Sequence, residues 1–394
     1  MKKIVSSIAI AAMLISGSMA YAEEGKHLAP PAGLDVHFGF PGTQGLNELL
    51  VKKGIVTKEE LEAQAKKHSM NIAGYIQVQG SIIGNNDELT NEASPKSFAD
   101  EDGFRIRRAK LAVFGYAYEH VKFKLEANFA GTPVLDDAYI EDDRLPFFIG
   151  RLGQFKVPFS LEELTSDTEI LSIERSEVVK QIAPGRDQGI SFSGVVTGGL
   201  LSYSIGAYNG TKAGTATTYS IGAYEDAAKN ATRNDNDQLL YAGRLVVKPL
   251  EWLNIGFSGL TSTEGTGALS MNHNAYGIDL QVKNPKRGCS LQGEYLRQWL
   301  KNNTTDITTT SDGFYVQAGH FLVEKHLEAV VKYEEYDSNK DVADRDDIKW
   351  VTVGLNFYIY GNHDAKLMAN YIVKDEKQNG YNNNTFLTQL QLRF

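Results

Sequence analysis

Four basic residues, Arg105, Arg107, Arg108 and Lys110, lie close together in the segment GFRIRRAKLAVFG. Guanidinium and ammonium groups that project into a narrow, water-filled channel replace part of an anion's hydration shell and repel cations. If this segment lined such a channel, the four residues would be candidates for binding small anions. They occupy both parities of an extended segment, so a β-bulge or a position at the rim must accommodate some of them.

Two further pairs of basic residues share strand faces with polar side chains. Lys122 and Lys124 alternate with apolar residues in VKFKLEANF, and Arg244 and Lys248 occupy one face of LLYAGRLVVK. Because side chains alternate between the two faces of a strand, we expect these four to line the lumen of a barrel. The competing interpretation is that they mark rims, snorkel, or neutralise lumen acids such as Glu126.

The long polar connection from Val157 to Asp187 is a candidate for a loop that narrows the channel. Its basic residues are Arg175, Lys180 and Arg186, so its charge balance is 3 − 7 = −4. The acidic residues are Glu162, Glu163, Asp167, Glu169, Glu174, Glu177 and Asp187. If the loop folds inward, these acids oppose the entry of anions unless they face the wall.

No arrangement of residues in the sequence indicates catalysis or a cofactor. His273, His320 and His363 fall in different segments, without a serine elbow or a telling pair of carboxylates nearby. The single cysteine, Cys289, excludes an internal disulfide and a four-thiolate metal site, and we expect its thiol to be buried. We therefore predict no enzyme activity, no cofactor and no metal site. The net charge of −9 makes nucleic acid an unexpected partner.

A two-residue period runs through most of the chain. In VKFKLEANF one face is wholly apolar and the other wholly polar, and similar alternation recurs around residues 276–283 and 365–371. The last segment, TFLTQLQLRF, alternates in the same way and ends on Phe394, which resembles the recognition strand of outer-membrane barrels. A mean hydropathy of −0.30 is compatible with membrane insertion, because alternating strands hide from hydropathy windows.

The connections distinguish a membrane barrel from a soluble sheet. We predict short joints at residues 117–120, 143–146, 198–199, 249–252, 284–288, 323–326 and 360–363. Longer joints alternate with them at 83–103, 131–136, 157–187, 209–237, 264–273, 301–312, 337–347 and 374–384. Short turns that alternate with long loops are typical of a barrel assembled from the periplasm. The pattern predicts an all-β, transmembrane antiparallel β-barrel of about 16 strands, whose interior is filled with water.

The first part of the chain differs from the rest. Residues 1–22 have the charged start, apolar stretch and small-residue cleavage site of a signal peptide, which predicts export and a mature chain beginning near Glu23. Residues 23–71 contain two short helical patterns, which we interpret as a periplasmic helical segment. The barrel is then expected to occupy residues 72–394.

Several unusual segments occur in an order that is found in a known family. They are GFRIRRAKLAVFG (103–115), FKLEANF (123–129), GRLGQFKVPFSLEEL (150–164), IERSEVV with APGRDQGISFSG (173–194) and IGAYNG (205–210). In these segments the sequence resembles the phosphate-selective porin O and P family of bacterial outer-membrane porins. The resemblance implies a sixteen-stranded barrel, usually a homotrimer, with a basic pore that accepts phosphate or other small anions.

The function expected from these observations is passive diffusion of small hydrophilic solutes, anions such as phosphate among them, through an outer-membrane channel. Outer-membrane lipid, lipopolysaccharide and the solutes themselves are the expected partners. One alternative is a general, unselective porin. Another is a structural barrel that sheathes or presents a partner, as a redox conduit or an adhesin. The acidic balance of the 157–187 loop leaves the choice of solute open.

Overall fold

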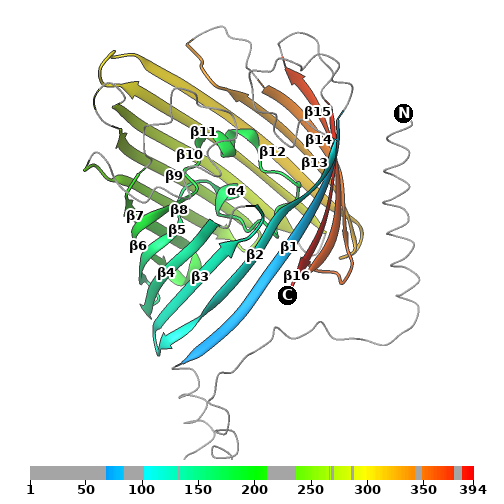
Figure 1. The fold of residues 1–394 in the computed structure, drawn as a ribbon, viewed down its shortest axis with the longest axis horizontal. Helices are drawn as coiled ribbons and strands as arrows, with labels where there is room; N and C mark the ends of the chain where they lie inside the picture. Colours follow the sequence, from blue (N-terminus) through cyan, green and yellow to red (C-terminus); the bar gives the residue numbers. More distant parts are fainter. Residues whose placement is uncertain are drawn as a thin grey trace, which may run out of the picture.

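The computed structural model describes residues 68–83, 102–131, 134–210, 237–265, 267, 270–284, 288–341, 348–376 and 384–394. Within them, sixteen antiparallel strands pair in sequence order, and β1 pairs with β16 to close a barrel (Figure 1). The predicted all-β, sixteen-stranded barrel is confirmed. The predicted signal peptide, residues 1–22, and all but the end of the predicted helical segment, residues 23–71, lie outside the described residues.

The strands are β1 (Ser69–Ile83), β2 (Gly103–Tyr118), β3 (Val121–Asn128), β4 (Val134–Leu145), β5 (Phe148–Lys156), β6 (Arg186–Val196), β7 (Leu201–Tyr208), β8 (Leu240–Leu250), β9 (Leu253–Glu264), β10 (Met271–Asn284), β11 (Cys289–Asn302), β12 (Thr308–Val323), β13 (Leu327–Asp337), β14 (Ile348–Tyr358), β15 (Ala365–Glu376) and β16 (Thr385–Arg393). Two short α-helices, α4 (Leu161–Leu164) and α5 (Glu177–Ile182), and the 3-10 helix η2 (Thr197–Gly199) lie between strands. Among the described residues, no helix is long and apolar enough to span a membrane.

The connections alternate between short turns at one end of the barrel and longer loops at the other. The turns β2–β3, β4–β5, β6–β7, β8–β9, β10–β11, β12–β13 and β14–β15 fall at the seven short joints expected from the sequence. The longest connection whose residues are all described joins β5 to β6 across residues 157–185. This asymmetry is the one that barrels of the outer membrane show.

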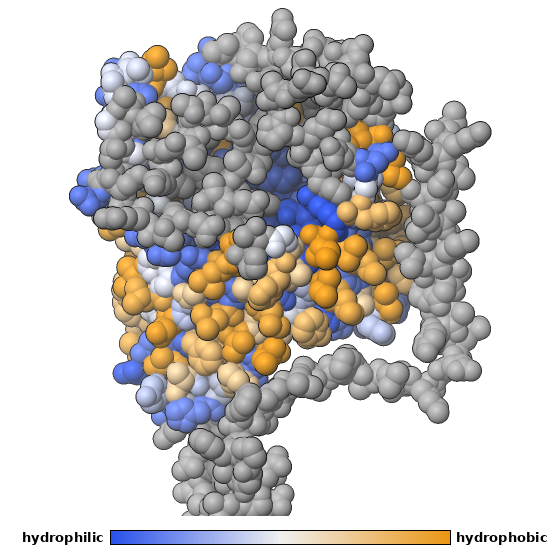
Figure 2. Space-filling view, viewed as in Figure 1, coloured by the Kyte–Doolittle hydropathy of each residue, from blue (hydrophilic) through white to orange (hydrophobic). Residues whose placement is uncertain are grey.

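The two faces of the sheet differ in polarity because the side chains alternate. On β1, Gln77 and Gln79 are fully buried inside the barrel, whereas Ile76 and Val78 are 43% and 40% exposed on its outside. Figure 2 shows apolar side chains gathered on the visible outer wall, with hydrophilic residues below them. An apolar outside and a polar inside suit a wall that separates hydrocarbon from an aqueous lumen.

The barrel closes where the last residues meet β1. The backbone N–H of Gly74 donates to the carbonyl oxygen of Phe394 at 2.9 Å, and the N–H of Phe394 donates to that of Gly74 at 3.0 Å. A Cβ atom at Gly74 would lie 2.8 Å from the Phe394 ring, so the ring covers the glycine closely. Leu390 and Leu392 are exposed on the same face as Phe394, as the alternation predicts.

A β-bulge in β2 resolves the parity problem of its basic residues. Gln77 of β1 pairs with Arg108, but Val78 pairs with Ile106, so Arg107 is the extra residue in the register. The bulge brings Arg105, Arg107, Arg108 and Lys110 to the lumen side, where all four bind acids of the 157–185 loop. Of the two alternatives predicted for this segment, a bulge or a position at the rim, the structure shows the bulge. We call these four residues the β2 basic row.

The loop of residues 157–185, hereafter the inner loop, folds into the barrel. It contacts β1 and β2 on one side of the lumen and β11 and β13 on the other, which only a segment inside the barrel can do (Figure 1). Its apolar side chains Val157, Phe159, Val178, Val179 and Ile182 are at most 1% exposed and pack on apolar residues of the wall. Their burial contributes on the order of 10 kcal/mol before the cost of ordering the loop is subtracted.

Gly313 on β12 allows the inner loop to approach the wall closely. A Cβ atom at this position would lie 2.9 Å from Cγ2 of Val178 on α5. The helix therefore sits directly against the backbone of the barrel.

Candidate functional site

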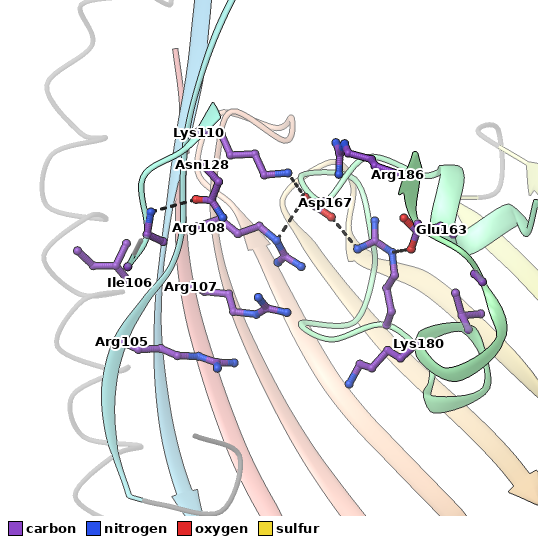
Figure 3. A pocket seen from close by; sticks show the side chains of 16 residues that line it. Arg105, Ile106, Arg107, Arg108, Lys110, Asn128, Glu163, Asp167, Lys180 and Arg186 are labelled. Carbon is purple, nitrogen blue, oxygen red and sulfur yellow. Dashed lines mark hydrogen bonds and ion pairs between the residues drawn. The ribbon is translucent and has the colours of Figure 1, made fainter. Parts of the chain in front are cut away.

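A cavity of about 260 Å³ is lined by the β2 basic row and by residues of the inner loop (Figure 3). Its charged lining consists of seven basic residues and two acidic ones. The basic residues are Arg105, Arg107, Arg108, Lys110, Arg175, Lys180 and Arg186, and the acidic residues are Glu163 and Asp167. Seven of the eleven basic residues singled out in the sequence thus meet in one place. The bulge turns the β2 set inward, the inner loop supplies Arg175 and Lys180, and the start of β6 supplies Arg186. We call this space the first cavity.

Glu174 of the inner loop binds Arg105 and Arg107 of the β2 basic row. The guanidinium of Arg107 donates to both oxygens of the Glu174 carboxylate, at 3.0 and 3.1 Å, and Arg105 Nη2 donates to Oε1 at 3.2 Å. Burial would raise the pKa of Glu174, but the nearby charges of Arg107 and Lys180 hold it well below its usual range. Glu174 is therefore an ionised partner of the row.

Asp167 of the inner loop binds Arg108 and Lys110 of the β2 basic row. Its Oδ2 atom accepts hydrogen bonds from Lys110 Nζ at 2.8 Å and from the Tyr75 hydroxyl at 2.9 Å, and lies 3.3 Å from Arg108 Nε. Its Oδ1 atom lies 2.7 Å from Arg175 Nη1. Burial opposes ionisation, but Arg108, Lys110 and Arg175 together hold the pKa of Asp167 well below its usual range.

A second cavity, of about 290 Å³, continues from the first along the lumen. Lys110, Asp167 and Arg186 line both cavities, so the two adjoin at these residues. The charged residues that line the second cavity are Lys110, Lys124, Arg151, Lys156 and Arg186 with Glu126, Asp137 and Asp167. Basic residues therefore outnumber acidic ones in both spaces, by a wider margin in the first.

The far side of the inner loop is fixed to the opposite wall by buried acids. Glu294 on β11 accepts hydrogen bonds from Ser160 Oγ at 2.9 Å and from the backbone N–H of Leu161 at 2.9 Å. Glu334 on β13 accepts one from the N–H of Glu177 at 3.0 Å. These carboxylates satisfy N–H groups at the starts of α4 and α5 that have no partner within the helices.

Two buried lysines of the wall complete the attachment. Lys332 Nζ donates to the carbonyl oxygen of Glu174 at 3.3 Å, and Lys366 Nζ donates to that of Ile170 at 3.1 Å. Sequence reasoning missed Glu294, Glu334, Lys332 and Lys366. In the sequence these four residues differ from others only in being charged residues on the lumen face of a strand. Many other positions have the same property, so it could not single them out.

Most acids of the inner loop bind protein partners, although Glu169 is exposed, and this pairing bears on the doubt raised by the loop's charge of −4. Asp167 and Glu174 bind the β2 basic row, and Glu162 accepts a hydrogen bond from the N–H of Ser176 at 2.8 Å. Glu163 lies 3.6 Å from Arg175 Nε. These acids therefore hold the loop and pair with part of the basic lining, in which basic residues still outnumber acidic ones by seven to two.

The remaining candidates lie elsewhere. Lys122 Nζ lies 2.7 Å from Asp143 Oδ2, and Lys124 Nζ lies 2.7 Å from Asp137 Oδ2 and 2.8 Å from Glu126 Oε2. Of these two, only Lys124 lines one of the two cavities. For both lysines, the geometry matches the interpretation that they neutralise lumen acids.

The two candidates on β8 have different surroundings. Arg244 is buried against Asp279, with Nη2 to Oδ1 at 2.9 Å, and so also neutralises a lumen acid. Lys248 is exposed near the turn that follows β8 and borders neither cavity. Arg151 and Lys156 of β5 line the second cavity but were not among the candidates.

Cys289 differs from the sequence expectation. It forms no disulfide, but its side chain is exposed rather than buried, with Sγ 3.1 Å from Nδ1 of His320. Cys289 opens β11 on the same outer face as Leu291, at the end of the strand where neighbouring side chains cover little. Within the described ranges, no group of three or more His, Cys, Asp or Glu side chains is arranged to hold a metal ion.

Comparison with known proteins assigns the family. The sequence model of the family described as "Phosphate-selective porin O and P" matches residues 87–258 and 272–394. An uncharacterized protein of Aquifex aeolicus (strain VF5) is 24% identical over 402 residues, which cover 88% of this chain and 92% of that protein.

Two solved structures illustrate the likeness in fold. The anion-selective porin from Comamonas acidovorans has a TM-score of 0.57 at 12% identity, over 82% of this chain and 98% of the porin. OmpT (in-vitro folded, trimer form), an outer membrane protein of Vibrio cholerae, has a TM-score of 0.55 at 11% identity, over 83% and 99%. These likenesses show a porin barrel, and the family match extends over most of the chain. The protein therefore belongs to the phosphate-selective porin O and P family of outer-membrane porins.

Proposed function

We propose that this porin conducts small hydrophilic anions, phosphate among them, across the outer membrane by passive diffusion. The observation that carries the proposal is the lining of the first cavity, in which seven basic residues face two acidic ones. The closed barrel with its apolar outer face provides the aqueous path, and the inner loop narrows that path beside the β2 basic row. As a porin the protein is a channel and not an enzyme.

The physical basis of selection is electrostatic. A unit positive charge about 7 Å from a monovalent anion stabilises it by about 0.6 kcal/mol even at the dielectric constant of water, which raises its local concentration about threefold. An excess of a few such charges enriches anions on the order of tenfold or more and depletes cations equally. The planar guanidinium groups of Arg105, Arg107, Arg108 and Arg175 also match the paired oxygens of phosphate or carboxylate.

A weakly selective general porin is the second candidate. It is favoured by the ion pairs that neutralise Lys122, Lys124 and Arg244, and by the more even balance of charges around the second cavity. A barrel that sheathes a threaded partner fits less well, because the inner loop crosses the lumen.

The proposal has further parts, which concern export, the N-terminal segment, partners and assembly. We include export through a cleaved signal peptide at residues 1–22, a short periplasmic helical segment that ends before β1 begins at Ser69, contact with lipopolysaccharide, and assembly as a homotrimer. A trimer form is described for OmpT of Vibrio cholerae, which has a similar fold. No cofactor is part of the proposal.

Single-channel recording in a planar bilayer tests the proposed function. In a gradient of potassium chloride, we expect the reversal potential to be displaced toward the equilibrium potential of chloride, and added inorganic phosphate to reduce the chloride current. Lys124→Gln, in the lining of the second cavity, should weaken the preference for chloride. Lys248→Gln removes the same charge outside both cavities and is the matched control. A displacement of the wild-type reversal potential toward potassium contradicts the proposal.

A further inference from the structure

The outer wall of the barrel carries a groove over strands β6 to β10, away from the pore. Its volume is about 640 Å³, which lies within the range of about 300–1,000 Å³ that proteins use for small organic ligands. Twelve described residues line it, and none of these is charged. Ile190, Ile205 and Tyr241 are exposed around it, on the apolar face of the sheet. We call this space the outer groove.

The outer groove exists because two glycines lie side by side on the outer face. Gly243 of β8 pairs with Gly259 of β9, and the same cross-strand row continues to Ile205 of β7 and Tyr276 of β10. A Cβ atom at Gly259 would meet nothing nearer than 4.0 Å, so no neighbouring side chain fills the space above this glycine. The two glycines therefore form a floor between taller neighbours.

The groove lies in the half of the wall that is nearer to the long loops. Ile190 is the fifth residue of β6 and Tyr241 is the second of β8, and both strands begin at that end. The long loops of outer-membrane barrels are extracellular, so the groove faces the outer leaflet, whose lipid is lipopolysaccharide. An empty groove would forfeit dispersion contacts with the surrounding hydrocarbon along its whole floor, so an acyl chain is favoured there.

A neutral polar patch borders the groove on the side of the long loops. Thr261 Oγ1 donates to Asn274 Oδ1 at 2.8 Å, and Thr263 Oγ1 donates to Asn272 Oδ1 at 3.0 Å. These four residues, which we call the polar shelf, face outward, because His273 between the two asparagines is buried on the lumen side. Hydroxyl and amide groups both donate and accept hydrogen bonds, which suits the sugar hydroxyls and the ester and amide links of a glycolipid.

The charges on the next strand, β11, are balanced. Lys301 Nζ lies 2.7 Å from Asp306 Oδ1, and Arg297 Nη1 lies 3.8 Å from Asp312 Oδ2. Each of these outward-facing cations thus has an acid beside it. The surroundings therefore favour contact with the sugar and acyl parts of a lipid over contact with its phosphate groups.

We propose that the outer groove binds one acyl chain of a lipopolysaccharide molecule, whose sugar headgroup rests on the polar shelf. The inference rests on the part of the proposed function that places lipopolysaccharide around the barrel. It goes further by assigning a site and the part of the lipid that the site holds. A second copy of the chain fits less well, because a stable protein interface uses about 20–30 residues on each side, whereas twelve line the groove.

Photo-crosslinking of the full-length protein in intact outer membranes tests the inference. The photoreactive residue p-benzoylphenylalanine replaces either Tyr241, at the edge of the groove, or Tyr371, which is exposed on the outer face of β15 and does not line the groove. Adducts are identified by their shift on denaturing gels and by an antibody to lipopolysaccharide. We expect the yield of the lipopolysaccharide adduct at position 241 to be about fivefold that at position 371, which corresponds to about 1 kcal/mol in binding.

Variants that fill the groove supply the second arm of the test. Gly259→Leu and Ala207→Leu each place a larger side chain in the groove, from β9 and from β7. Ala369→Leu is the matched control, since Ala369 lies on the outer face of β15, between the buried Met368 and Asn370, and does not line the groove. We expect each groove variant to lower the adduct yield at position 241 about fivefold. Ala369→Leu should leave the yield unchanged.

The inference is overturned by equal adduct yields at positions 241 and 371, or by a yield at position 241 that neither groove variant lowers. An adduct at position 241 with a phospholipid or with a second copy of the chain also overturns it, because another occupant then fills the groove. If lipopolysaccharide adducts are absent at both positions, the proposed contact with lipopolysaccharide fails as well. A channel that prefers cations contradicts only the proposed conduction of anions, since the crosslink does not depend on current.

Discussion

The attachment of the inner loop to the far wall can be weakened at a single atom. Glu294 accepts hydrogen bonds from Leu161 N at one oxygen, and from Ser160 Oγ at 2.9 Å and Glu162 N at 3.3 Å at the other. In Glu294→Gln, one oxygen becomes an NH₂ group that faces a donor. At least one hydrogen bond is therefore lost and a buried donor is left without a partner, at a cost of about 1–3 kcal/mol.

This cost should appear as movement of the inner loop rather than as unfolding of the barrel. A loss of about 2 kcal/mol raises the population of a detached α4 about thirtyfold. The wall keeps its own ladder of hydrogen bonds, so the temperature at which the barrel unfolds should change little. We expect single-channel recordings of Glu294→Gln to show more frequent excursions to a higher conductance.

The control for this experiment is Glu328→Gln. Glu328 is a buried acid of β13 that accepts hydrogen bonds from Tyr358 Oη at 2.6 Å and Asn356 Nδ2 at 3.3 Å, both on the neighbouring strand. It undergoes the same chemical change without losing a bond to the inner loop. The reasoning is refuted if Glu294→Gln has the conductance and current noise of the wild type, or if Glu328→Gln shows the same excursions.

Three further predictions concern charge, pH and barrel closure. Lys122→Glu combined with Lys124→Glu reverses two lumen charges and should shift the reversal potential toward potassium, further than Lys124→Gln does. Because the pKa of Asp167 is lowered in the folded protein, its contribution to loop stability is complete above the ordinary carboxyl pKa of about 4 and is lost only as the pH falls through the lowered value. The difference in conductance between the wild type and Asp167→Asn should thus stay constant from pH 7 to about pH 4, and its disappearance near pH 6 would contradict this assignment. Gly74→Ala places a Cβ atom 2.6 Å from the carbonyl oxygen of Lys110 and should destabilise the barrel by about 1–3 kcal/mol in urea titrations. Gly259→Ala, whose Cβ meets nothing nearer than 4.0 Å, should not destabilise it in this way.

The barrel could be predicted because its rules are local. A two-residue period and an alternation of short and long joints both follow from individual segments, and each is visible without knowledge of the neighbouring strands. A bulge or a rim position could be predicted for the segment 105–110, because four cations on both parities of one strand cannot otherwise be accommodated, but the place of the bulge at Arg107 is seen only in the structure.

The constriction could be predicted only in part. The basic residues of β2 and of the inner loop were recognisable by type, but their partners are set by how the loop packs inside the barrel. Nothing in the sequence connects Asp167 to Arg108, or Glu294 to the start of α4, since these pairs lie 59 and 133 residues apart. The charge balance of −4 was misleading for the same reason, because acids that hold a loop in place count the same as acids that face the pore.

The most direct test of the account is to locate a bound anion in crystals of the wild-type protein. Crystals soaked in selenate, an analogue of a tetrahedral oxyanion, can be examined by anomalous diffraction. The account predicts an anomalous peak in the first cavity, within hydrogen-bonding distance of the arginines of the β2 basic row or of Arg175. Anomalous peaks confined to exposed sites such as Lys248, in a protein whose single channels conduct anions, would contradict it.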